Sequence, residues 1–317
     1  MTSNFRATFA FASMLLATSA LAAPQGQGEQ VAPVSHSKRF GSDIVLPFYL
    51  NEDGLPLIEG AVDGKTGVFL LDTGNSDRFL LNRSYVPLDA GIPVGGGTFA
   101  SGQTVVLRRH SGVHTAELSG VISVTTSSGD RKTPDATLSI DARQSDIHID
   151  PRLLGWLGWG FLKNYVTTIE YRSGIVRLAP IATAPPSTRS NADLVVSFIP
   201  SSPVVPFTAD VGGYATPAIL DTAGWDRLAL QPLNWTKITA ANVVEARPGV
   251  GCILVKSAAV GGEHVDLVDF ERTERKEERL TLGAEFLRLY TSVWDPRDGT
   301  VTLTPNGSEN PPRKDCS

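Results

Sequence analysis

The stretch Val68-Phe69-Leu70-Leu71-Asp72-Thr73-Gly74 leads an unbroken apolar run into a carboxylate, a hydroxyl and a glycine. A continuous apolar run is typical of a strand that is buried on both faces. Such a strand would carry Asp72 to the edge of a core, where a carboxylate needs partners because an unpaired buried charge is costly. Asp-Thr-Gly also forms ordinary surface turns, so the triplet on its own predicts little.

The aspartate turn recurs in the second half of the chain. With an offset of 149 residues (221 − 72 = 149), eight positions of the segment 62–81 are identical in the segment 211–230 without a gap. Further on, Leu157-Gly158-x-x-Phe161-Leu162 recurs as Leu282-Gly283-x-x-Phe286-Leu287. Two copies of one unit, at a period too long for a solenoid, indicate an internal duplication. We therefore expect two lobes of like fold related by a pseudo-twofold axis.

A twofold axis brings equivalent residues together, and the strongest candidate for such a pair is Asp72 with Asp221. Two carboxylates a few ångströms apart do not both ionise easily, so they share a proton. The ionised partner can take a proton from a water molecule that attacks a carbonyl carbon, while the protonated partner donates to the carbonyl oxygen. The pair therefore predicts amide hydrolysis without a metal or a covalent intermediate.

Strand and turn signals dominate the chain, and the expected fold class is all-β. Short apolar segments at 44–50, 57–62 and 67–71 are separated by Asp-Gly pairs, and Asp63-Gly64 is a strong signal for a two-residue hairpin turn. One short helix is expected over 161–165.

Composition excludes some functions. The chain has 317 residues, 41% of them hydrophobic, and a net charge of −5, so nothing suggests a nucleic-acid partner.

Residues 1–23 combine Arg6, an apolar core and Ala20-Leu21-Ala22, which is typical of a cleaved signal peptide. We expect a periplasmic or secreted protein with no membrane association after signal cleavage.

The two motifs, Leu71-Asp72-Thr73-Gly74 and the later Leu-Gly-x-x-Phe-Leu segment, resemble those of the aspartic proteases, both pepsin-like and retropepsin-like. The resemblance implies a two-lobed acid-protease fold with duplicated β-barrel-like lobes, a cleft between them, a peptide or protein substrate and no cofactor.

The expected division of the chain is a signal peptide at 1–23, a flexible tail at 24–43, an N-terminal lobe at 44–180, a linker at 181–193, a C-terminal lobe at 194–305 and a C-terminal tail at 306–317. The implied site comprises the catalytic pair Asp72 and Asp221, the supporting residues Thr73, Gly74, Thr222 and Ala223, and a flap that contains Gly95, Gly96, Gly97, Thr98 and Phe99.

One position departs from the family pattern. Ala223 stands where the family has glycine, and a methyl group there could displace a carboxylate. The chain is thus expected to be an aspartic-type peptidase, and the alternative is a catalytically weak or inactive pseudoprotease that binds peptides between its lobes. A third interpretation, in which two chains pair through their first lobes, is disfavoured by the duplication, so a monomer is expected.

Cysteine and histidine residues give weaker signals. Cys252 and Cys316 are the only cysteines, and in an exported protein they are candidates for a disulfide, the alternative being two unpaired thiols. His110 and His114 are four residues apart in a segment of strand and loop, which does not hold them on one face, so no metal site is expected.

Overall fold

The computed structural model describes residues 43–98, 104–126, 136–141, 149–186, 190–191, 193–202, 204–211, 213–224, 228–230, 244–246, 252–255, 258–260, 263–265, 270–272 and 280–308. The expected signal peptide, nearly all of the N-terminal tail, Phe99 and Cys316 lie outside these residues. For Cys252 the backbone alone is described, so the disulfide stays a prediction.

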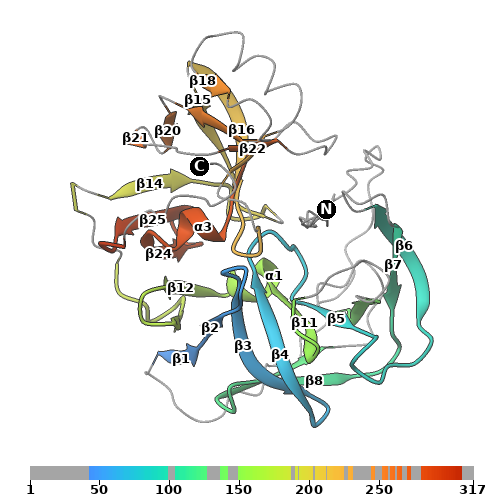
Figure 1. Cartoon of the computed structure of the whole chain (residues 1–317). Coiled ribbons are helices and arrows are strands. Elements are labelled where there is room, and N and C mark those ends of the chain that lie inside the picture. The colour runs from blue at the N-terminus through green and yellow to red at the C-terminus, as the bar shows by residue number, and fades with distance from the viewer. Residues whose placement is uncertain are drawn as a thin grey trace, which may run out of the picture.

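Three β-sheets form the described part of the chain, and the all-β expectation is confirmed (Figure 1). A ten-stranded sheet from the first half has the order β6-β7-β10-β5-β11-β4-β3-β8-β9, with β2 paired to β3. Its strands are β2 (Tyr49–Leu50), β3 (Pro56–Val62), β4 (Lys65–Asp72), β5 (Phe79–Asn82), β6 (Ile92–Thr98), β7 (Thr104–Arg109), β8 (His114–Leu118), β9 (Ile122–Thr126), β10 (Leu138–Ile140) and β11 (Leu153–Gly158).

A nine-stranded sheet from the second half repeats this plan in the order β18-β19-β22-β17-β23-β16-β15-β20-β21. Its strands are β15 (Pro206–Val211), β16 (Tyr214–Leu220), β17 (Leu228–Leu230), β18 (Val244–Ala246), β19 (Cys252–Val255), β20 (Ala258–Val260), β21 (Glu263–Val265), β22 (Phe270–Arg272) and β23 (Leu280–Leu282).

The two aspartate strands have equivalent neighbours, which makes the duplication visible in the strand pairing. β4 runs parallel to β11 with Leu71 opposite Leu157, and β16 runs parallel to β23 with Leu220 opposite Leu282. Each aspartate strand is also the second strand of an antiparallel hairpin, β3–β4 and β15–β16. The predicted turn at Asp63 and Gly64 closes the first hairpin; both residues have positive φ, 49° and 82°, as the preferred two-residue turn requires.

A six-stranded sheet joins the two halves in the order β1-β13-β12-β24-β25-β14. Its strands are β1 (Ile44–Pro47), β12 (Tyr165–Glu170), β13 (Ile175–Pro180), β14 (Leu194–Ser197), β24 (Tyr290–Asp295) and β25 (Thr300–Pro305). The junction is the antiparallel pair β12–β24, in which Thr167 lies opposite Trp294. Strands of the first and second halves therefore form one continuous sheet between the two lobes.

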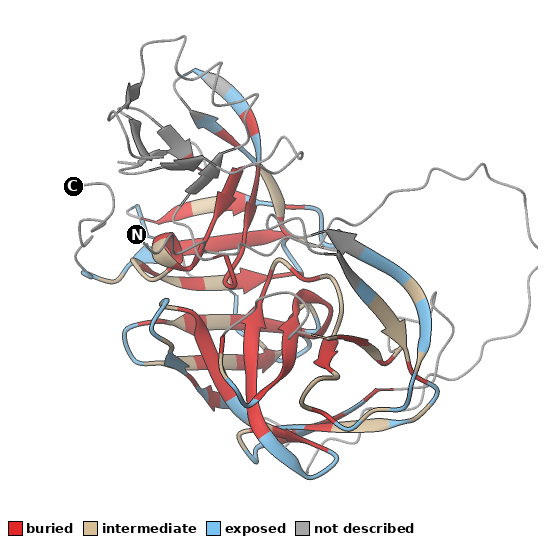
Figure 2. Ribbon diagram, turned by 45° about the vertical axis from the view of Figure 1, so that its right-hand side comes forward, coloured by how far each residue is buried: buried red, intermediate tan, exposed pale blue. Residues whose placement is uncertain are grey.

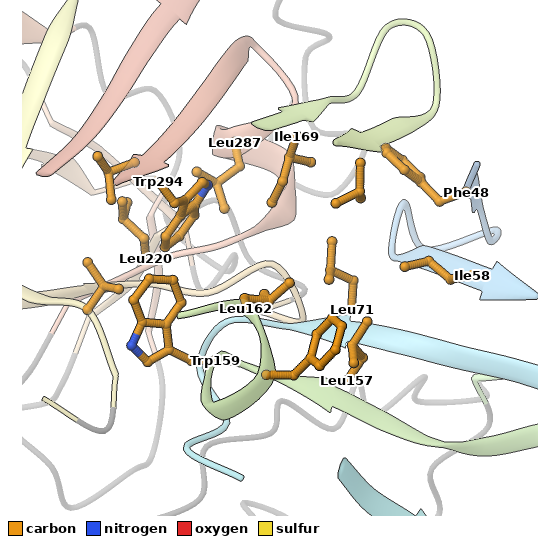
Figure 3. Close-up of a cluster of buried hydrophobic side chains, with 14 of the residues drawn as sticks. Phe48, Ile58, Leu71, Leu157, Trp159, Leu162, Ile169, Leu220, Leu287 and Trp294 are labelled. Atoms are coloured by element: carbon orange, nitrogen blue, oxygen red, sulfur yellow. The ribbon is translucent and has the colours of Figure 1, made fainter. Parts of the chain in front are cut away.

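The core continues across this junction. One cluster of buried side chains contains residues of both halves, and Figure 3 shows Trp159 and Leu162 of the first half beside Trp294 of the second. Trp159 packs against Trp294 with ring centroids 5.8 Å apart. The strands that carry the two aspartates end inside this buried region (Figure 2).

Two one-turn helices occur among the described residues, α1 (Trp159–Leu162) and α3 (Ala284–Leu287). The first begins two residues before the predicted segment, because Gly158 and Gly160 bring the chain against the backbone of the aspartate turn. No helix in the described ranges has the length and apolar character needed to cross a membrane.

Candidate active site

The two duplicated aspartates meet at the lobe boundary. Asp72 is the last residue of β4 and Asp221 directly follows β16. Both side chains are buried, with 5% and 2% of the residue surface exposed. Asp221 acts on Asp72 through its charge and as a side-chain hydrogen-bonding partner, and two carboxyl groups can interact in this way only when one of them carries a proton.

The two threonines after the aspartates fix the turns against each other. The N–H group of Thr73 donates to the hydroxyl oxygen of Thr222, and the N–H group of Thr222 donates to the hydroxyl oxygen of Thr73, both at 3.0 Å. Each hydroxyl then donates into the opposite strand, Thr73 to the carbonyl oxygen of Leu220 at 3.2 Å and Thr222 to that of Leu71 at 2.7 Å. Four reciprocal hydrogen bonds in a buried site hold the aspartate turns in one relative position.

Each turn is also closed by backbone hydrogen bonds that have a counterpart in the other. The N–H group of Asn75 donates to the carbonyl oxygen of Asp72 at 3.2 Å, and that of Gly224 donates to the carbonyl oxygen of Asp221 at 3.0 Å. At the helix starts, Trp159 donates its N–H to the carbonyl oxygen of Asn75 and Ala284 donates to that of Gly224, both at 2.7 Å. The substitution at Ala223 therefore leaves the backbone of its turn equivalent to the first.

Gly74 lies directly against the partner carboxylate. A Cβ atom built on Gly74 would be 2.6 Å from Cγ of Asp221 and 2.7 and 2.8 Å from its two oxygens, closer than Cβ atoms approach in real proteins. A glycine is therefore needed at this position. In the second turn, the N–H group of Ala223 donates to Oδ1 of Asp221 at 2.9 Å, while its methyl group is buried.

The pKa of Asp72 lies well above its usual value. Burial is the largest cause, and the negative charge and hydrogen bond of Asp221 raise the pKa further, whereas the N–H groups of Gly74 and Asn75 lower it. The raised pKa belongs to two interacting carboxyl groups, so the pair shares one proton.

The predicted flap residues lie in a separate hairpin. Gly95, Gly96, Gly97 and Thr98 belong to β6, which pairs with β7 in an antiparallel ladder (Figure 1). Gly95 and Gly96 are exposed.

The two histidines that were weighed as metal ligands have other partners. Both ring nitrogens of His110 are hydrogen-bonded, Nδ1 to Asp89 and Nε2 to the hydroxyl of Ser139. His114 is hydrogen-bonded through Nδ1 to Asp63 at 2.6 Å.

Two further titratable residues lie near the aspartate turns, and the sequence singles out only the first, Asp77, which recurs beside the second turn as Asp226. Burial raises the pKa of the Asp77 carboxyl to about 6, and the N–H group of Asp77 donates to the side-chain oxygen of Asn75 at 2.9 Å. Tyr171 is buried, and both burial and the charge of Asp221 raise its pKa. The recurrence of aspartate at position 77 is a signal in the sequence, but nothing in the sequence points to Tyr171.

Comparisons with known proteins agree with this architecture. No protein-family model matches the chain, and no curated protein matches it. Among solved structures, the aspartic proteinase from Irpex lacteus matches with a TM-score of 0.50 and 13% sequence identity, over 84% of this chain and 98% of that one. The fold is therefore the two-lobed fold of an aspartic proteinase, and at this identity the likeness shows the fold alone.

Proposed function

We propose that the protein is an aspartic peptidase in which Asp72 and Asp221 act together on one water molecule. The observation that supports this most directly is the burial of two carboxyl groups at the ends of two equivalent strands, whose turns are joined by reciprocal threonine hydrogen bonds. The fold of an aspartic proteinase makes a hydrolase the natural class for such a pair.

The proposed reaction uses the one proton that the pair shares and assigns it to Asp72. Asp221, ionised, removes a proton from water as the water oxygen bonds to the carbonyl carbon of the peptide, and Asp72 donates its proton to the carbonyl oxygen. The resulting tetrahedral diol collapses when the C–N bond breaks. The amine nitrogen takes the proton from Asp221, and one diol hydroxyl returns a proton to Asp72, which restores the starting state. The threonine hydrogen bonds preorganise the pair so that little rearrangement accompanies each step.

The test is cleavage of a denatured protein between acid and neutral pH by the chain without residues 1–23. Asp72→Asn and Asp221→Asn should each lower kcat/KM on the order of 10³-fold or more, because each removes one member of a catalytic unit. Asp53→Asn, in an exposed turn, is the matched control and should cleave like the parent protein. Equal cleavage by the parent and both dyad variants would contradict the proposal.

A second candidate function is a peptide-binding pseudoprotease, which Ala223 favours because it stands where the family has glycine. Peptide binding without turnover by the parent protein, and no turnover by Ala223→Gly, would support it. The equivalent backbone hydrogen bonds of the two turns argue for the active enzyme instead.

Both carboxyl groups come from one chain, which supports a monomeric enzyme rather than a pairing of first lobes. Sedimentation at assay concentration should give a single species of one chain, and a dimer that loses activity on dilution would contradict this. Export to the periplasm or medium is part of the proposal and is supported by the sequence of residues 1–23. N-terminal sequencing of the mature protein tests it.

A further inference from the structure

The two aspartate turns differ in side-chain chemistry at the position that faces the dyad. Gly74 and Ala223 are equivalent by the internal offset of 149 residues (223 − 74 = 149). The hydrogen bonds that close the turns match closely, at 3.2 and 3.0 Å, and those to the helix starts are 2.7 Å in both. The direction of the Cβ atom at position 74 therefore indicates that of the real methyl group of Ala223.

That direction is toward the partner carboxylate. A Cβ atom on Gly74 would point at the carboxylate of Asp221, 2.6 Å from its Cγ atom. By the pseudo-twofold symmetry, the equivalent approach in the second turn is that of the Ala223 methyl group to the Asp72 carboxyl group. Since real Cβ atoms do not approach so closely, the second turn must hold its partner slightly farther away than the first turn does.

The packing of Ala223 supports the same direction. Ala223 belongs to a cluster of buried apolar side chains of which only one other member, Ala284, comes from the second half. The remaining members come from the first half of the chain: Leu55, Leu57, Val68, Leu70, Leu80, Ile140, Ile149, Leu153 and Trp156. The cluster that contains Ala223 therefore extends into the lobe that carries Asp72.

We propose that the Ala223 methyl group excludes water from one face of Asp72 and thereby moves the working pH range of the dyad toward neutral. The inference rests on the proposed peptidase function and assigns to Ala223 a positioning role that determines this range. Asp221 does not experience the same effect, because the residue that faces it is Gly74, which has no side chain.

The charged groups near Asp72 are compatible with an effect of the Ala223 methyl group on its ionisation. The carboxylate of Asp221, from the other lobe, is the charge that acts on Asp72, and Asp77 and Arg78 lie in the same turn as Asp72. The elements packed beneath the turn, β11 and α1, present Gly158 and Trp159, which carry no charge. Burial is the largest cause of the raised pKa of Asp72, which agrees with a desolvating methyl group.

The experiment titrates the dyad with ¹³C-labelled aspartate carboxyl groups, observed by NMR and assigned with Asp72→Asn. Ala223→Gly should lower the upper apparent pKa of the pair by roughly one unit, because water reaches the carboxyl group again. Ala223→Ser should lower it as well, because the hydroxyl group can donate to the ionised carboxylate. Ala284→Gly removes a methyl group from the same cluster without facing Asp72 and should leave the titration unchanged.

Activity supplies the second readout. In the pH profile of kcat/KM, the alkaline limb should shift to lower pH by the same amount in Ala223→Gly. It should stay in place in Ala284→Gly. An unchanged or raised upper pKa in both Ala223 variants would overturn the inference, even if the protein cleaves peptides. A lowered pKa in a protein that does not cleave would uphold the inference and overturn the peptidase function instead. If Ala223→Gly does not fold, the Ala223→Ser titration decides.

Discussion

Thr73 and Thr222 exchange hydrogen bonds across the lobe boundary: each backbone N–H group donates to the hydroxyl oxygen of the other residue at 3.0 Å. The two residues are 149 positions apart, so this exchange links the halves of the chain at the point where the carboxyl groups meet. Both side chains are fully buried, and water therefore does not replace a bond that is lost.

The first prediction concerns this exchange. Thr222→Val keeps the shape of the side chain but leaves the N–H group of Thr73 and the carbonyl oxygen of Leu71 without their partner. Each unsatisfied buried group costs about 1–3 kcal/mol, so the loss of two partners should lower the free energy of unfolding by about 2–6 kcal/mol. Urea unfolding measures the loss. Thr222→Ser, which keeps the hydroxyl group, is the control; a Val variant as stable as the Ser variant would show that the exchange contributes little.

The second prediction concerns the close approach of Gly74 to Asp221. A methyl group at position 74 would lie 2.6 Å from Cγ of Asp221, so Gly74→Ala must displace the carboxylate and should lower kcat/KM on the order of 10²-fold. In the other turn, Gly224→Ala meets its nearest atom, Cγ2 of Thr281, at 3.1 Å and should cost less. Steady-state kinetics with circular dichroism as a folding check compares them. Similar kcat/KM values for both variants would refute a specific contact at Gly74.

The third prediction concerns pH and the base of the β6–β7 hairpin. His110 follows β7 and bonds to Asp89, which precedes β6, and to Ser139 of β10, so it ties the base of the hairpin to the sheet. Burial lowers the pKa of His110 despite the opposing effect of Asp89. The unfolded chain therefore binds a proton more readily than the folded chain, and stability should fall as pH decreases below about 6.5.

Urea unfolding between pH 7.5 and 4.5 tests this dependence. His110→Phe, which has no titrating ring, should show a shallower decrease in stability from pH 6.5 downward than the parent protein. Asp89 raises the pKa of His110, so Asp89→Asn should lower that pKa further. In this variant the decrease in stability should therefore extend to lower pH. Identical slopes in the parent and His110→Phe would mean that His110 does not contribute.

Much of the fold follows from short patterns in the sequence. The apolar run before Asp72 and its copy before Asp221 predict buried strands, and the repeated Leu-Gly segments predict the duplication that appears in the parallel pairs of Leu71 with Leu157 and Leu220 with Leu282. The hairpin turn at 63–64 is equally local, because its φ angles are set by the two turn residues themselves.

The rest depends on long-range partners that periodicity does not encode. The pairing of Thr167 with Trp294 creates the sheet shared by the two halves, yet each strand alone is an ordinary apolar segment. The bonds of His110 join it to residues that are distant in the sequence, and the charge of Asp221 acts on Tyr171 only because the two halves lie together. The sequence does identify Ala223 as unusual, but the direction of its methyl group follows from the geometry of Gly74.

The central claim is that Asp72 and Asp221 form one catalytic unit that shares a proton, and a double-variant cycle on peptide cleavage tests it most directly. If the carboxyl groups act as a unit, Asp72→Asn, Asp221→Asn and the double variant should all show about the same loss in kcat/KM, because removing one member already abolishes the mechanism. Losses that multiply in the double variant, or full activity in either single variant, would contradict the claim.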